Sequence, residues 1–127
     1  VIVGVHTYPP LPGAMTWWRS SVADVASLCR RPPAGLIVAG DLNATRDHAP
    51  LRDLGGCTSA GEQAGIGGLA TWPSSTGTTL LGATIDHVFV DGTVWEGKKG
   101  RVVTIPGTDH RAVVVQLSDQ SQQPTGH

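Results

Sequence analysis

The strongest constraint on this fold is a short apolar run at residues 36–39, which leads straight into a polar segment. The run Leu-Ile-Val-Ala follows Gly35 without a polar interruption. An uninterrupted apolar run of this length is typical of a central strand that is covered on both faces. Residues 40–43, Gly-Asp-Leu-Asn, come next. The sequence therefore predicts that Asp41 and Asn43 lie at the end of a buried strand.

A strand and a helix precede this run. Residues 1–5 are rich in valine and isoleucine and predict a buried strand that ends at His6, and the proline-rich segment after it predicts a loop. From Thr16, which can cap a helix, the pattern is helical up to the two prolines at 32–33. The apolar stripe of this helix consists of Trp18, Val22, Val25 and Cys29. The order strand, helix, strand predicts an α/β layer.

The second half of the chain is predicted to be mainly antiparallel β-structure. Asp47 can cap a short helix, and residues 56–83 are mostly loop. Turn signals then separate three predicted strands, at residues 84–90, 101–105 and 112–117. Residues 118–127 are polar and predict a disordered tail. One domain is therefore expected over residues 1–117.

Charge and length exclude several classes of protein. The 127 residues carry a net charge of −1, so the broad basic surface needed for sequence-independent nucleic-acid binding is not expected. No apolar run approaches the length of about 20 residues that a helix needs to cross a bilayer, so the given chain is expected to be soluble. Cys29 and Cys57 are compatible with free thiols or with one bridge. Because the chain starts at Val1 instead of Met, we expect it to be part of a longer protein.

Polar side chains follow the predicted strands at positions where rigid scaffolds usually carry chemistry. Asp41 and Asn43 can jointly hold a water molecule or a cation, or they can merely shape a turn. Asp86 lies inside an apolar strand, where a charge is unfavourable unless it is paired. His110 can supply that partner and would become more basic by doing so. The alternative is a core histidine that one carboxylate satisfies.

Three motifs in this order resemble the C-terminal motifs of the endonuclease/exonuclease/phosphatase superfamily. They are G-D-L-N at residues 40–43, I-D-H-V-F-V at 85–90 and G-T-D-H-R-A-V at 107–113. The resemblance implies a phosphoesterase that depends on a divalent metal, Mg²⁺ or Mn²⁺, and that directs water in line at phosphorus. It implies an α/β (α+β) fold, namely the C-terminal half of a four-layer α/β/β/α sandwich with mostly antiparallel strands.

The resemblance also implies roles for individual residues around the attacking water. Asp41 would orient or deprotonate this water, and Asn43 would hold it or a phosphoryl oxygen. Asp109 would help to bind the metal.

Further residues would contact the phosphoester substrate itself. His110, oriented by Asp86, would stabilise the charge that develops on the phosphoryl oxygens. His6 would lie near the leaving-group oxygen, and Arg111 is a candidate phosphate contact.

The chain departs from the superfamily pattern before His6. The family carries an Asn and a Glu metal ligand in an N-terminal half, and neither precedes His6 here. Glu62 and Glu96 lie in a glycine-rich loop and a predicted hairpin, so neither fills the position. We therefore expect the partner of this chain to be the missing N-terminal half of the same domain. An inactive remnant or binding module is the alternative, as is a nuclease, which the net charge does not favour.

Residues 69–73, followed by 85–87, resemble a bacterial branch of the superfamily that is related to glycopeptide resistance. In this branch the domain follows membrane helices and faces outward, with lipid-linked phosphates as implied substrates. The resemblance implies a location at the extracytoplasmic face of a bacterial membrane. The alternative is that Trp72 merely packs a loop against the core.

Overall fold

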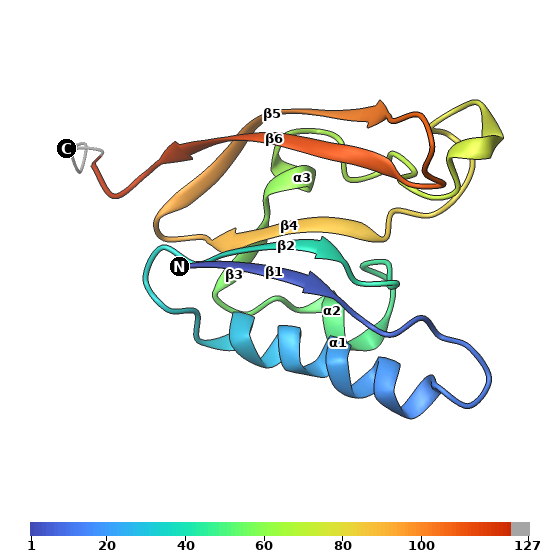
Figure 1. Ribbon diagram of the computed structural model, residues 1–127. Helices are drawn as coiled ribbons and strands as arrows, with labels where there is room; N and C mark the ends of the chain where they lie inside the picture. Colours follow the sequence, from blue (N-terminus) through green and yellow to red (C-terminus); the bar gives the residue numbers. More distant parts are fainter. Residues whose placement is uncertain (123–127) are drawn as a thin grey trace.

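The computed structural model describes residues 1–122, which form two sheets with helices beside them (Figure 1). The elements in chain order are β1 (Ile2–His6), α1 (Met15–Arg30), β2 (Ile37–Asp41), α2 (Ala49–Arg52), β3 (Cys57–Ser59), α3 (Ala60–Gln63), a 3-10 helix (Ser74–Thr76), β4 (Asp86–Asp91), β5 (Trp95–Thr104) and β6 (Arg111–Asp119). No helix within residues 1–122 is long and apolar enough to cross a bilayer.

The larger sheet has four strands in the order β1-β2-β4-β3, and β5 and β6 form a separate hairpin. β1 and β2 are parallel, whereas β4 is antiparallel to both β2 and β3. The predicted α/β fold with mostly antiparallel strands is thereby confirmed. α1 lies along one face of the larger sheet, and the hairpin lies on the other side of it (Figure 1).

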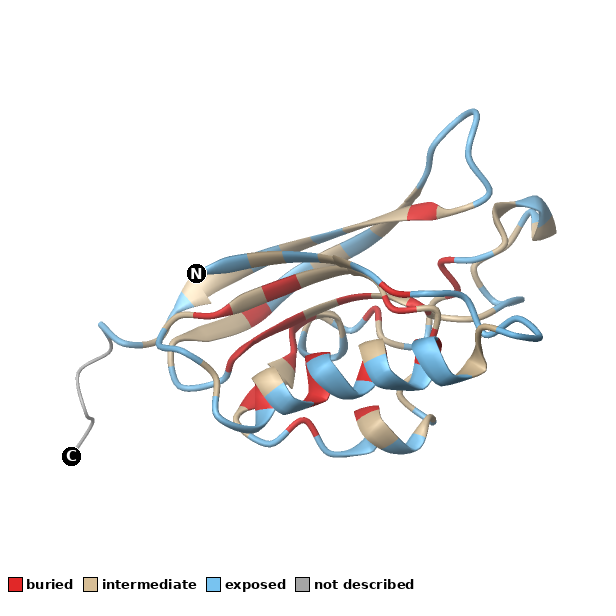
Figure 2. Ribbon diagram, turned by 60° about the horizontal axis from the view of Figure 1, so that its bottom comes forward, coloured by how far each residue is buried: buried red, intermediate tan, exposed pale blue. Residues whose placement is uncertain are grey.

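The main core lies between α1 and the larger sheet. All four residues of the predicted apolar stripe are buried, and they pack with Leu36, Val38 and Phe89. In Figure 2 the ribbon of α1 alternates between buried residues in red and exposed residues in pale blue. Burial of such large side chains contributes roughly 1.5–3 kcal/mol for each of them.

Two predictions for the first strands and helix were wrong in detail. β1 was predicted to be buried, but within residues 1–122 it is an edge strand, and Ile2 is 79% exposed. Only its alternate residues Val3 and Val5 pack against the core, because an apolar run alone does not reveal how many neighbours a strand has. The helix begins at Met15, so Thr16 lies inside it and Ala14 precedes it without a side-chain cap.

The second half also differs from the sequence-based expectation. His48, not Asp47, precedes the short helix α2. The segment predicted as mostly loop contains β3 and α3, which are too short to show a clear periodicity. β6 extends to Asp119, past the predicted domain boundary at residue 117. Residues 123–127 of the predicted tail lie outside the described residues.

Cys29 and Cys57 form a disulfide, which decides between the two alternatives left open by the sequence. The bond connects the last turn of α1 to the first residue of β3, with the two Cα atoms 5.1 Å apart. Both cysteines are buried, at 0% and 5% exposure. The helix is therefore covalently fixed to the sheet on which it packs.

One glycine is required directly before the candidate site. Gly40 has a φ of +150°, and a Cβ atom at this position would lie 1.9 Å from the carbonyl oxygen of Val5. Only glycine lets β1 approach β2 this closely while keeping that backbone conformation. Gly40 therefore fixes the path of β2 where it delivers Asp41.

Candidate active site

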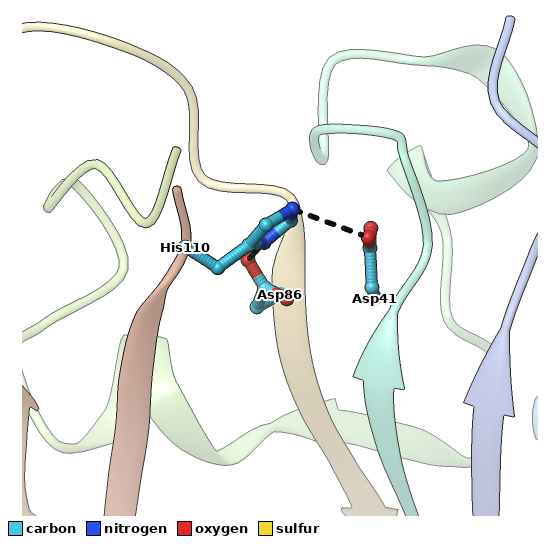
Figure 3. A group of neighbouring side chains, drawn as sticks. All are labelled: Asp41, Asp86 and His110. Atoms are coloured by element: carbon cyan, nitrogen blue, oxygen red, sulfur yellow. Dashed lines mark hydrogen bonds and ion pairs between the residues drawn. The ribbon is translucent and has the colours of Figure 1, made fainter. Parts of the chain in front are cut away.

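Two neighbouring strands place two carboxylates at one end of the larger sheet. β2 ends at Asp41 and β4 begins at Asp86, and the two residues are direct partners in the strand register. Direct partners in a sheet project their side chains from the same face. His110 comes from the other sheet, since it directly precedes β6, and its imidazole lies between the two carboxylates (Figure 3).

The imidazole of His110 bridges the two acids. Its Nδ1 lies 2.9 Å from Oδ2 of Asp86, and its Nε2 lies 3.6 Å from Oδ2 of Asp41. Because a carboxylate only accepts hydrogen bonds, Nδ1 carries the proton that it donates to Asp86. Partial burial by itself would lower the pKa of His110. The hydrogen bond that His110 donates to Asp86, together with the charges of Asp86, Asp41 and Asp109, outweighs burial and raises that pKa above its usual 6.5.

Asn43 stands in a turn that also organises Asp41. Its φ is +47°, and its backbone N–H donates to Oδ1 of Asp41 over 2.7 Å. Its side-chain amide donates to the carbonyl of Thr7 over 3.1 Å, and its own carbonyl accepts from the buried indole of Trp18 over 3.1 Å. The turn expected as one alternative is present, and it fixes the orientation of the Asp41 carboxylate.

His6 lies at the open edge of this group. Its Nε2 is 3.5 Å from Oδ2 of Asp41, and its side chain is 78% exposed. Asp41 itself is only 15% exposed. The structure therefore brings four of the predicted residues together, His6, Asp41, Asp86 and His110, with His6 facing solvent.

Asp109 is held to the side of the group by a residue that the sequence did not single out for this role. Oδ2 of Asp109 accepts a hydrogen bond of 3.1 Å from the indole nitrogen of Trp72. Trp72 remains 41% exposed, so it is not simply packed into the core. It is a polar partner of a candidate metal ligand.

Arg111 has surroundings that favour anchoring over the phosphate contact expected from the sequence. The residue is only 4% exposed. Its guanidinium donates to the carbonyls of Ala70, Ser74 and Thr78 and to the hydroxyl of Thr76, at 3.0 to 3.3 Å. These donors therefore hold the loop that carries Trp72.

His87, next to Asp86 in the strand, points to the opposite face of the sheet and is a core residue. Its Nε2 lies 2.7 Å from the carbonyl of Ala44, and its ring stacks on Phe89. Burial is the main influence on this imidazole and lowers its pKa below 6.5. His87 is therefore neutral near pH 7 and donates to Ala44.

The donor set at the site suits a hard divalent cation. Asp41, Asp86 and His110 each offer a ligand atom, and these atoms lie within 4.8 Å of one another. Carboxylate oxygens are the ligands that Mg²⁺ prefers, and Mn²⁺ accepts both carboxylates and imidazoles. Glu62 and Glu96 are not in this group of described residues, and they pair instead with Arg46 and Lys98 at 2.8 and 2.6 Å.

Solved structures of similar fold share this architecture at low sequence identity. A mannosyl-6-phosphatase from Bacteroides thetaiotaomicron is 17% identical, with a TM-score of 0.60. The match covers 92% of this chain and 50% of that protein's chain. The human Nocturnin catalytic domain with bound sulfate is 16% identical, with a TM-score of 0.63 and coverages of 93% and 46%. The 3′ phosphatase NExo from Neisseria, bound to product DNA hairpin, is 19% identical, with a TM-score of 0.62 and coverages of 92% and 60%.

These comparisons show a shared fold, and the chain spans about half the length of the first two proteins. No curated protein shows a matching sequence. The family model described as "Endonuclease/Exonuclease/phosphatase family" matches residues 1–110, which include β1, the larger sheet and His110. The chain therefore belongs to the endonuclease/exonuclease/phosphatase family of hydrolases.

Proposed function

We propose that this chain is the catalytic C-terminal half of a phosphoester hydrolase of the phosphatase or phosphodiesterase type, which depends on a divalent metal. The observation that carries the proposal is the position of His110 between two carboxylates, 2.9 Å from Asp86 and 3.6 Å from Asp41. Family membership of residues 1–110 supports the reaction class.

His110 stabilises the charge that develops on the phosphoryl oxygens. Asp86 accepts a hydrogen bond from Nδ1–H and thereby directs Nε2 toward the substrate side. The raised pKa keeps a larger share of the imidazole protonated at neutral pH, so it presents a positive charge and a donor. The interaction of such a preorganised donor with the phosphoryl oxygens is stronger in the transition state than in the ground state.

Asp41 acts on the attacking water. Its Oδ1 is occupied by the N–H of Asn43, which leaves Oδ2 to orient the water and to accept its proton. The water oxygen then forms a bond to phosphorus as the bond to the leaving-group oxygen breaks. Asn43 holds the water or a phosphoryl oxygen, and the exposed ring of His6 lies near the leaving group.

Asp109 is the residue of this chain that would help to hold Mg²⁺ or Mn²⁺, while Asp41 acts on the water and Asp86 orients His110. A divalent ion bound there supplies charge neutralisation at the phosphoryl oxygens. Trp72 donates to one oxygen of Asp109 and restricts its rotation. By the family resemblance, an Asn and a Glu from an N-terminal half would complete the ligand set, and this chain covers about half the length of two of the solved structures.

A nuclease is the second candidate, because NExo, one of the proteins of similar fold, is bound to a product DNA hairpin. The net charge of −1 argues against strong binding to a phosphate backbone. Cleavage of a DNA hairpin at near-physiological salt, at rates above those for small phosphoesters, would favour this candidate.

The disulfide supports an extracytoplasmic location. Disulfides form and persist in oxidising compartments and are rare in the cytosol. When cells are quenched in acid and the protein is alkylated under denaturing conditions without reductant, Cys29 and Cys57 should therefore stay unlabelled. Complete labelling of both cysteines would contradict this location.

The experiment that tests the reaction uses the full-length protein and two small substrates, p-nitrophenyl phosphate and bis-p-nitrophenyl phosphate. Asp41→Asn and His110→Gln should each lower kcat by about 100-fold or more, because each removes a group that handles a proton or charge in the transition state. Chelation should abolish the rate, and Mg²⁺ or Mn²⁺ should restore it. Relative rates on the two substrates distinguish phosphatase from phosphodiesterase.

Glu96→Gln is the matched control, because it also removes a carboxylate that has one basic partner, Lys98, but lies outside the site. This variant should keep the wild-type rate. If folded Asp41→Asn and His110→Gln proteins also keep the metal-dependent rate, the proposed roles are wrong.

A further inference from the structure

The pair formed by Asp86 and His110 joins two separate sheets. Asp86 opens β4 in the larger sheet, and His110 directly precedes β6 in the hairpin. Within residues 1–122, β4 and β6 share no strand pairing. Some other contact must therefore hold the two strand ends at the distance that the 2.9 Å hydrogen bond requires.

Thr71 contacts both strand ends. Its hydroxyl oxygen accepts the backbone N–H groups of Ile85 and Asp86 at 3.1 and 3.2 Å. Its carbonyl accepts the N–H of Arg111, the residue after His110, at 2.7 Å. One side chain and one carbonyl of the same residue thus bind the segments that carry both members of the pair.

The hydroxyl of Thr71 has no spare capacity. A threonine hydroxyl offers one donor and two acceptor sites. Both acceptor sites are used by Ile85 and Asp86, and the donor points to the carbonyl of Ala83 at 3.4 Å. Thr71 is 0% exposed, so water does not substitute for these bonds. Loss of the hydroxyl would leave two buried N–H groups without their acceptor, which is unfavourable.

The segment around Thr71 is itself held in place. The guanidinium of Arg111 donates to the carbonyl of Ala70 at 3.0 Å. The N–H and hydroxyl of Ser74 donate to the carbonyls of Asp109 and Thr108, at 2.7 and 2.9 Å. These bonds attach residues 70–74 to residues 108–111 on both sides of Thr71, so the position of the Thr71 hydroxyl relative to β4 is fixed.

We propose that Thr71 is a positioning residue, which sets the separation between the Asp86 carboxylate and the His110 imidazole by bonding to both strand ends. The inference rests on the proposed function for its effect on catalysis, but its structural content concerns the pair alone. Thr71 contacts neither substrate nor reacting atoms, and it acts through Asp86 and His110.

The test compares Thr71→Val, which keeps the shape and removes the hydroxyl, with Thr71→Ser, which keeps the hydroxyl. Both are made in the full-length protein. Thr71→Val should lower kcat by about 10-fold to 100-fold with little change in KM, as expected when a partner of a catalytic group is lost. Thr71→Ser should restore most of the wild-type kcat. Thr84→Val is the matched control, because among residues 1–122 the hydroxyl of Thr84 bonds to a loop carbonyl, that of Leu69 at 2.7 Å, and to neither strand end.

A second readout does not depend on activity. The proton on Nδ1 of His110 gives a strongly downfield NMR signal while it is hydrogen-bonded to the Asp86 carboxylate. This signal should move upfield or broaden in Thr71→Val and stay in place in Thr71→Ser and Thr84→Val. An unchanged signal in folded Thr71→Val overturns the positioning role, whether or not the protein hydrolyses phosphoesters.

The two readouts separate the two hypotheses. An inactive wild-type protein whose NMR signal responds as expected would refute the proposed function and leave the positioning role intact. If Thr71→Val does not fold, Thr71→Ser carries the test, because a loss of the signal in this variant shows that the hydroxyl is not what holds the pair.

Discussion

Removal of the disulfide between Cys29 and Cys57 should strongly destabilise the protein. The perturbation is chemical reduction, which changes no side chain other than the two sulfur atoms. The bond joins α1 to β3 across a sequence separation of 28 residues. In the folded state both cysteines are buried, so reduction leaves the packing around them largely as it was.

The expected magnitude follows from the length of the closed loop. A cross-link lowers the entropy of the unfolded chain by an amount that grows with the logarithm of the number of residues it encloses. For a separation of 28 residues this corresponds to about 3.5 kcal/mol of stability at 25 °C. Such a loss is a large part of the stability of a typical domain, which is about 5–15 kcal/mol.

The assay is urea unfolding of the full-length protein, oxidised and reduced, followed by circular dichroism. The free energy of unfolding should fall by about 3.5 kcal/mol on reduction. The dependence on urea should become steeper, because the reduced unfolded chain exposes more surface. Cys29→Ala combined with Cys57→Ala provides the control, since reductant should not change the stability of this variant.

Burial adds a kinetic expectation. Cys29 is 0% exposed, and thiolate attack needs access to a sulfur atom. Without denaturant, reduction should therefore proceed only through opening of the α1 and β3 region. The reasoning is refuted if reduction is fast in the native state, or if full reduction changes the free energy of unfolding by less than about 1 kcal/mol against the calculated 3.5.

Two further predictions concern residues outside the site and their contribution to the stability of the protein. Burial alone would raise the pKa of Asp91, but its carboxylate accepts from Gly35 and Thr93, and these hydrogen bonds lower that pKa below the usual 3.8. The stabilisation is complete above pH 3.8 and is lost as the pH falls through the lowered pKa of the folded protein. Asp91→Asn should therefore lower the free energy of unfolding at pH 7 and weaken its dependence on pH under acidic conditions, as measured by urea unfolding. An unchanged pH dependence in this variant would contradict the assignment. The hydroxyl of Thr58 is buried without a hydrogen-bond partner among residues 1–122. Thr58→Val should therefore raise the free energy of unfolding by about 1 kcal/mol in thermal or urea melts. A less stable variant would contradict this prediction.

The sequence predicted the parts of the fold that depend on local periodicity. The stripe on α1 was correct because four apolar residues at helical spacing have one simple solution, a helix with one buried face. The central position of β2 was also correct. The burial of β1 was wrong because the number of strand neighbours depends on sheet order, which residues 1–5 do not encode.

The pairing of Asp86 with His110 could be predicted for a different reason. A carboxylate in an apolar strand needs a partner, and few residues in the chain could supply one. The role of Thr71 could not be predicted in this way, because threonine is common in loops. Its importance arises from contacts with residues 14 to 40 positions away in the chain, which no local pattern reveals.

The division of the site between two sheets also bears on how the site can be switched off without unfolding the protein. Asp41 and Asp86 are strand neighbours and stay together as long as the larger sheet is formed. His110 is held beside them by the packing of the β5–β6 hairpin and by contacts such as that between Thr71 and Arg111. Local opening of a protein costs less free energy than global unfolding. A brief undocking of the hairpin would therefore remove His110 from the site while α1 and its sheet stay folded.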